Sequence, residues 1–212
     1  LGEGNRIHAA NMCPDWRHFD VLCDGKFYCH LDMGVLGRHN AMNALAASAA
    51  AWMMGIPGEA VSRGLVSFHG AGRRMEFKGK FHGADVYDDY AHHPDEVAAT
   101  ISAVRDAMPG RRLVLAFQPH TYSRTSALFD DFVRELSRAD VLVLAEIYAA
   151  RERNTIGISS ADVAEKIPGA VFCETLPEVT EYLRQNVREG DVVLTMGAGD
   201  IFRAGEALLK SE

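Results

Sequence analysis

The hydrophobic pattern changes once in the first third of the chain. Residues 1–33 alternate apolar and polar side chains around Asp24-Gly25, a favourable two-residue hairpin turn, so this region predicts two strands of a sheet whose remainder is absent. Apolar residues then recur at helical spacing from 45 to 53, and Gly55 suits the end of that helix. A second helix is predicted from Pro57 to about Phe68.

The stretch "HGAGRR" interrupts this pattern and predicts a domain boundary near residues 70–80. Beyond it, five short apolar runs each precede an amphipathic segment. The expected strands are "ADVYDDY", "RLVLAFQ", "DVLVLAE", "AVFCE" and "DVVLTMG", and the expected helices lie near 94–108, 125–138, from 159, 176–188 and from Asp200. The alternation predicts an α/β fold with a parallel sheet covered by helices on both faces.

Composition narrows the functional classes. The 212 residues are 48% hydrophobic and 24% charged, and the net charge of −7 argues against a nucleic-acid or membrane partner. No apolar run reaches about 18 residues. The four cysteines show no CxxC spacing, which favours neither zinc nor disulfides and indicates a reducing cytoplasm. Because the chain opens in mid-pattern without Met, we expect a piece of something longer.

Polar clusters follow four of the predicted strands: "DDYAHH", "QPHTYSRT", "EIYAARERNTIG" and "GAGD". In a parallel α/β sheet, ligands bind outside the carboxyl ends of the strands. The clusters are therefore predicted to form one rim, with residues 88–93 as one wall of a cleft.

Each cluster also has a structural interpretation. Asp88 and Asp89 could be acids in the first turn of a helix, where the dipole favours negative charge. His92 and His93 are adjacent on an extended backbone and point in opposite directions, so we do not expect them to share a metal ion. "GAGD" could offer backbone N–H groups to an anion, or it could be a tightly packed turn.

Two further patterns leave two interpretations open. Arg124 suits a carboxylate or phosphate through its bidentate fork, but an ordinary surface ion pair is the alternative. Asn40 and Asn43 are i, i+3 neighbours whose carboxamides could face one planar ligand, or one of them could be a helix N-cap.

Five motifs together identify a resemblance. "GRHNAMNALAA", "GAGRRMEF", "DDYAHHPDEV", "FQPHTYSRT" and "GAGDI", in this order, resemble the Mur ligase family of bacterial cell-wall synthesis. The resemblance implies that residues 1–72 are the last part of a central ATPase domain, a hairpin plus two helices. It implies a Rossmann-like C-terminal domain for residues 73–212. The sequence has no G-x-x-x-x-G-K-[ST] phosphate loop, so we expect this chain alone to be inactive.

The resemblance also implies roles for individual residues around ATP. His39, Asn40 and Asn43 would surround the adenine, and Asp89 would accept hydrogen bonds from the ribose. Arg74, rather than Arg73, would reach the nucleotide. No metal ligand is expected in this chain, because the family's magnesium ligands lie mostly upstream.

A second set of roles concerns the other substrates. Tyr90 and His92 would lie beside the sugar-lactyl and amino-acid site, and His120 and Arg124 would hold the incoming alanine, with Arg124 on its carboxylate. His92, His120 and Arg124 are the expected catalytic residues. Many relatives have arginine where Thr121 stands, which leaves position 121 without a predicted role.

The implied activity is an ATP- and Mg²⁺-dependent ligase that joins L-alanine to UDP-N-acetylmuramate through an acyl phosphate. Alternatives are a non-catalytic nucleotide-binding or regulatory module and the related ligase that recycles murein tripeptide. A dinucleotide-dependent oxidoreductase is excluded, because no G-x-G-x-x-G follows a first strand. Assembly into a homo-oligomer is left open.

Overall fold

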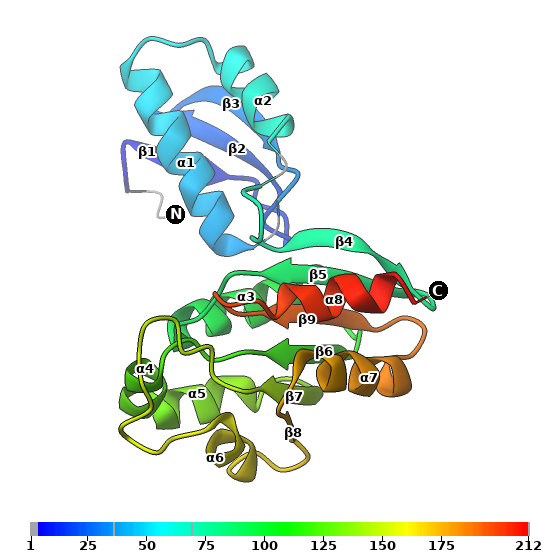
Figure 1. Ribbon diagram of the computed structural model, residues 1–212. Helices are drawn as coiled ribbons and strands as arrows, with labels where there is room; N and C mark the ends of the chain where they lie inside the picture. The colour runs from blue at the N-terminus through cyan, green and yellow to red at the C-terminus, as the bar shows by residue number, and fades with distance from the viewer. Residues whose placement is uncertain (1–3, 36, 69, 212) are drawn as a thin grey trace. The chain divides into compact units, whose positions relative to one another are not determined.

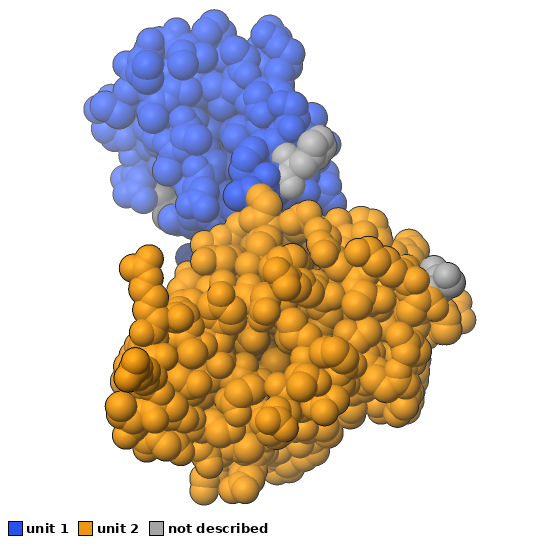
Figure 2. Space-filling model, viewed as in Figure 1, with its two compact units in different colours: residues 1–71, 102–109 blue, residues 72–101, 110–212 orange. Residues whose placement is uncertain are grey.

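A computed structural model describes residues 4–35, 37–68 and 70–211. Contacts divide the chain into two compact units, which Figure 2 colours separately. The first unit comprises residues 1–71 and 102–109, and the second comprises residues 72–101 and 110–212. Each unit has its own buried apolar core.

The first unit contains an antiparallel sheet in the order β1-β2-β3, formed by Ile7–Ala10, His18–Cys23 and Lys26–Asp32. The predicted hairpin turn is confirmed, because Asp24 and Gly25 both have positive φ, at 48° and 74°. The prediction of two strands was wrong, because the structure has three. β1 has four half-buried residues, too short a run to show clear alternation.

Both predicted helices of this unit are confirmed as α1, Arg38–Met53, and α2, Gly58–Val66. Gly55, at φ 74°, follows the last turn of α1. The core beneath the helices combines strand and helix residues that are all buried: Phe19, Val21, Leu31, Met33, Ala41, Ala44 and Leu45.

The second unit is built on a six-stranded sheet (Figure 1) in the order β4-β5-β9-β6-β7-β8. The strands are Glu76–Phe81, Ala84–Asp89, Val192–Met196, Leu113–Phe117, Val141–Ala145 and Val171–Cys173, respectively. The five predicted strands are all present and mutually parallel. Sequence reasoning missed β4, an antiparallel edge strand whose pairing with β5 is interrupted by an irregularity between Phe77 and Gly79.

Helices cover both faces of this sheet, as predicted (Figure 1). They are α3 (Pro94–Ala107), α4 (Tyr122–Ala127), α5 (Phe129–Leu136), α6 (Ser160–Glu165), α7 (Leu176–Asn186) and α8 (Phe202–Leu209). α7 and α8 pack on one face against side chains such as Val114 and Ala116. On the other face Phe117 meets Phe132 of α5, with ring centroids 5.7 Å apart.

Two local predictions about helices have different outcomes. The helix expected from residue 159 is confirmed, because Ser159 is the N-cap of α6 and forms a reciprocal capping box with Asp162. The single helix expected near 125–138 was wrong. The chain forms α4 and α5 instead, with Leu128 between them at φ −116°, outside the helical region.

Candidate functional site at the carboxyl edge of the sheet

The strand order brings the four polar clusters to one edge of the second unit. β5, β9, β6 and β7 are neighbours and run parallel, so the segments that follow them leave the sheet on the same side. These are residues 90–93, 197–201, 118–121 and 146–158, and we call their common surface the carboxyl edge.

A row of aromatic rings joins three of these segments. Successive ring centroids lie 5.4 Å apart from Tyr90 to His92, 5.9 Å from His92 to His120, and 5.6 Å from His120 to Tyr148. The last pair is stacked, with 18° between the planes. The structure therefore brings together three predicted residues, Tyr90, His92 and His120, and adds Tyr148, which was not predicted.

Arg124 lies on α4 one turn beyond His120. Its Nη1 is 3.4 Å from Nδ1 of His120 and donates to the His120 carbonyl oxygen at 3.3 Å. Among the described residues Arg124 forms no ion pair with a carboxylate, so the surface ion pair considered as an alternative is not found. Burial, the Arg124 charge and His92 together lower the pKa of His120, which favours its neutral imidazole.

His92 is fixed by its own backbone and by α3. Its Nδ1 lies 2.9 Å from the Tyr90 carbonyl oxygen and 3.3 Å from Oε2 of Glu96. The same carboxylate accepts the backbone N–H groups of His92 and His93, at 3.0 and 3.2 Å. Glu96 thus holds the turn that presents the His92 ring to His120.

Asp88 and Asp89 belong to β5 and are 1% and 3% exposed, so the proposal that they sit in the first turn of a helix was wrong. Asp89 Oδ1 accepts the Ala91 N–H at 2.8 Å, and Oδ2 accepts the Met75 N–H at 2.8 Å. Burial raises the pKa of Asp89 despite these bonds. With so little exposed surface, a ribose contact would require this carboxylate to open from its internal partners.

The "GAGD" segment is a tightly packed turn. The N–H of Gly197 donates to the Asp89 carbonyl at 3.0 Å, and those of Asp200 and Ile201 donate to Oε1 of Gln118 at 3.0 and 3.1 Å. A Cβ on Gly197 would lie 2.6 Å from the Gln118 carbonyl oxygen. The N–H groups of Gly197 and Asp200 are therefore used within the protein and are not available to an anion.

The predicted adenine residues lie in the other unit, on the first turns of α1. His39 and Asn43 are exposed and Asn40 is half-buried. The N-cap of α1 is Gly37, so neither asparagine is the cap, and that alternative was wrong. The carboxamides remain i, i+3 neighbours on a helix, as the planar-ligand hypothesis requires.

Sequence reasoning missed three residues that build the carboxyl edge. Gln118 is 5% exposed and its Nε2 donates to Oδ1 of Asp200 at 3.1 Å. Backbone bonds join Tyr148 to Pro119 and Thr121, both at 2.9 Å. Glu152 accepts the N–H of Ser123 at 2.9 Å. All three stand in or beside motifs already identified, and their position just after buried strands was the available signal.

The groups that could hold a nucleotide are few. Arg74 is exposed, and its guanidinium carbon lies 5.6 Å from the Tyr90 ring centroid, so its charge suits a phosphate. Across the described ranges, no three His, Cys, Asp or Glu side chains are arranged to hold a metal ion.

The four cysteines are free thiols, and no helix in the described part of the chain is long and apolar enough to cross a bilayer.

Comparison with known proteins decides the family. Residues 73–199 match the family described as Mur ligase, glutamate ligase domain. The chain belongs to the Mur ligase family. UDP-N-acetylmuramate–L-alanine ligase of Lachnospira eligens is 47% identical over 196 residues, which cover 91% of this chain and 42% of that protein. The ligase of the same name from Aquifex aeolicus is 44% identical over 192 residues, covering 91% and 42%.

Solved structures agree with this assignment. The crystal structure of UDP-N-acetylmuramate-alanine ligase from Thermotoga maritima superposes with a TM-score of 0.82 at 26% identity, covering 99% of this chain and 46% of that one. A murein peptide ligase from Psychrobacter arcticus shares the fold, with a TM-score of 0.65 at 22% identity over 99% and 45% of the two chains. This Mur ligase chain spans less than half the length of each of these four relatives.

Proposed function

We propose that this chain is part of an ATP-dependent cytoplasmic ligase that joins L-alanine to UDP-N-acetylmuramate in peptidoglycan synthesis. The observation that carries the proposal is Arg124, a guanidinium beside His120 with no carboxylate partner among the described residues. Similarity to ligases of that name, at 47% identity, supports the choice of substrates.

The carboxyl edge would supply the alanine site. Arg124 would bind the amino-acid carboxylate through its planar fork, a geometry that lysine cannot reproduce. The lowered pKa of His120 keeps its imidazole neutral, so it can accept a proton from the alanine ammonium group before the amine attacks. His92 and Tyr90 continue the same row of rings and would border the sugar-lactyl group.

ATP, with Mg²⁺, would supply the phosphoryl group that activates the muramoyl carboxylate as an acyl phosphate. In this chain Arg74 would bind its phosphates, His39, Asn40 and Asn43 would bind its adenine, and Asp89 would bind its ribose after opening from its internal hydrogen bonds. Mg²⁺ would be held mostly by residues outside this chain. The 212 residues alone would then show no turnover.

A comparison of two amine donors, assayed separately, tests the proposal. The full-length protein from the source organism is assayed for phosphate release with ATP, UDP-N-acetylmuramate and either L-alanine or the murein tripeptide. We expect release with L-alanine only. Release with the tripeptide only would favour the recycling ligase. Nucleotide binding without release in either assay would favour a regulatory module.

A further inference from the structure

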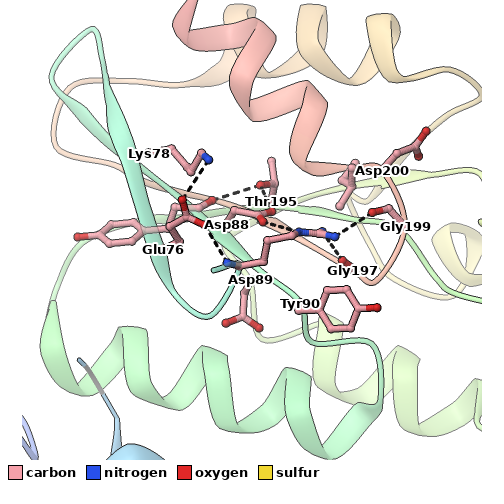
Figure 3. A network of polar contacts seen from close by, with 12 residues as sticks. Glu76, Lys78, Asp88, Asp89, Tyr90, Thr195, Gly197, Gly199 and Asp200 are labelled. Atoms are coloured by element: carbon pink, nitrogen blue, oxygen red, sulfur yellow. Dashed lines mark hydrogen bonds and ion pairs between the residues drawn. The ribbon is translucent and has the colours of Figure 1, made fainter. Parts of the chain in front are cut away.

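The guanidinium of Arg73, a residue that the resemblance ranks below Arg74, donates to three acceptors beside the carboxyl edge: Asp88, Gly197 and Gly199, which Figure 3 labels. Its guanidinium donates to Oδ2 of Asp88 at 2.8 Å, to the Gly197 carbonyl at 2.6 Å and to the Gly199 carbonyl at 3.1 Å. Each of its three nitrogens donates one of these bonds. Arg73 therefore joins the segment before β4 to the end of β5 and to the turn after β9.

The acceptor of this arginine is itself held in place. Asp88 is 1% exposed, and its second oxygen accepts the Thr195 hydroxyl at 2.8 Å. Thr195 lies on β9, next to β5 in the sheet. Lysine carries a single ammonium group, so replacing an arginine that binds several acceptors with lysine breaks some of these hydrogen bonds.

Arg73 also holds Tyr90 in two ways. The Tyr90 N–H donates to the Arg73 carbonyl oxygen at 2.7 Å. The guanidinium carbon lies 5.0 Å from the Tyr90 ring centroid and 4.7 Å from that of Phe202, both within cation–π range. Tyr90 is 36% exposed, so one side of its ring is supported by Arg73 while the residue still reaches solvent.

The backbone on both sides of Arg74 is constrained. Arg73 and Met75 have φ of 58° and 47°, in the left-handed region that these residue types rarely adopt. The Arg73 N–H donates to Oε2 of Glu76, and the Met75 N–H donates to Oδ2 of Asp89, each at 2.8 Å. Arg74, between them, presents an exposed cation from a fixed main chain.

From these contacts we infer that Arg73 is a positioning residue that holds Tyr90 and Arg74 in the arrangement the substrates need. It acts through these neighbours and does not itself bind a ligand. The inference rests on the proposed function, because the ligand roles of Tyr90 and Arg74 come from there.

The test compares Arg73→Lys with wild type in the full-length protein, and Arg112→Lys serves as the matched control. Arg112 forms a similar cluster with Asp191 and the Asn186 carbonyl, at the opposite edge of the sheet. We expect Arg73→Lys to raise the KM values for ATP and L-alanine about 10-fold or more, while Arg112→Lys lowers thermal stability and leaves both KM values unchanged. Equal KM effects of the two variants would overturn the inference.

A double-mutant cycle with Tyr90→Leu shows whether Arg73 acts through Tyr90. If it does, Arg73→Lys has a smaller effect on the KM for L-alanine in the Tyr90→Leu background than in wild type. Strictly additive effects would overturn the inference. Phe202→Leu, which removes the other ring beside the guanidinium, provides a milder variant and is expected to show a smaller KM increase of the same kind.

Amide hydrogen exchange separates this inference from the proposed function. Arg73→Lys is expected to speed exchange of the Tyr90 amide in the full-length protein, whatever reaction that protein catalyses. Unchanged exchange would overturn the inference even if the ligase assay succeeds. A wild-type protein inactive with every amine donor would refute the proposed function alone. Exchange and ATP affinity by titration calorimetry would then decide the role of Arg73.

Discussion

The two edges of the large sheet use arginine differently. At the amino edge, where β5, β9 and β6 begin, Arg111 donates to Asp85 at 2.5 Å and to the Asp191 carbonyl at 2.6 Å. Arg112 binds both carboxylate oxygens of Asp191, at 3.0 and 2.7 Å. Beside the carboxyl edge Arg73 is held in this way, whereas Arg74 and Arg124 form no ion pair among the described residues.

The difference separates structural from functional charge. Arginines at the amino edge neutralise carboxylates that folding buries, such as Asp191, which is 4% exposed. Arg74 and Arg124 retain donors that the protein does not use, which is the condition for binding an anionic ligand. We therefore expect that removing an arginine from the amino edge lowers stability. Removing Arg74 or Arg124 from the carboxyl edge should instead weaken ligand binding.

The largest effect is expected from Arg124→Ala. Loss of a charge-assisted, bidentate contact should raise the KM for L-alanine by about 100-fold. The free energy of unfolding should change little, because the only contacts of Arg124 with His120 are long, at 3.3 and 3.4 Å. Steady-state kinetics and urea denaturation of the full-length protein measure the two quantities.

Arg134→Ala is the matched control for Arg124→Ala, since Arg134 lies on the neighbouring helix α5 with its side chain 62% exposed. It should leave the KM for L-alanine unchanged. A similar rise in KM for both variants would mean that the effect is a general consequence of lost positive charge.

Arg112→Ala should have the opposite signature. It leaves the Asp191 carboxylate hydrogen-bonded to the Arg188 N–H at 2.8 Å. We expect the free energy of unfolding to fall by about 2 kcal/mol, less than for a fully buried pair, because Arg112 is partly exposed. Below its unfolding temperature the variant should keep wild-type KM values, and a raised KM for L-alanine would contradict the comparison.

Two glycines sharpen the same comparison with smaller effects. A Cβ on Gly199, at the carboxyl edge, would lie 2.3 Å from Oε1 of Gln118 and 2.7 Å from Cγ of Tyr148, whereas one on Gly190, at the amino edge, meets nothing within 4 Å. Gly199→Ala should cost about 1–2 kcal/mol and lower kcat/KM by displacing Tyr148. Gly190→Ala should cost about 1 kcal/mol through its φ of 83° and leave kcat/KM unchanged, as thermal unfolding and kinetics would show.

The smallest effect concerns pH. Burial, Arg124 and His92 lower the pKa of His120 in the folded protein, so the unfolded chain binds more protons in the window just below the ordinary value of about 6.5. The stability from neutral His120 is complete above that window and declines as the pH falls through it. Lowering the pH from 8 to 5 should therefore reduce the free energy of unfolding of wild type more than that of His120→Gln. A difference that does not change with pH would contradict this origin.

Much of the second unit could be predicted because its strands are buried on both sides. β6 and β9 are buried at every position and read as continuous apolar runs. The sequence did not predict β4, because this strand lies at the edge of the sheet, contains Gly79 and leaves Phe77 52% exposed. The break between α4 and α5 was not predicted, because Leu128 is an ordinary helix former and only its φ of −116° marks the end of α4.

The site was predictable where chemistry follows a strand end and unpredictable where it depends on distant contacts. Tyr90, His92 and His120 all lie where the parallel topology requires. The role of Arg73 depends on carbonyls of Gly197 and Gly199, 124 and 126 positions away, and on a left-handed backbone. No periodicity in the sequence indicates either.

The most direct measurement compares Arg124→Ala and Arg112→Ala in one assay of the full-length protein. Phosphate release dependent on ATP, UDP-N-acetylmuramate and L-alanine is recorded against L-alanine concentration, at a temperature where both variants are folded. Our account predicts a KM for L-alanine raised about 100-fold in Arg124→Ala and unchanged in Arg112→Ala. An unchanged KM in Arg124→Ala, or equal losses in both, would contradict the assignment of substrate binding to the carboxyl edge.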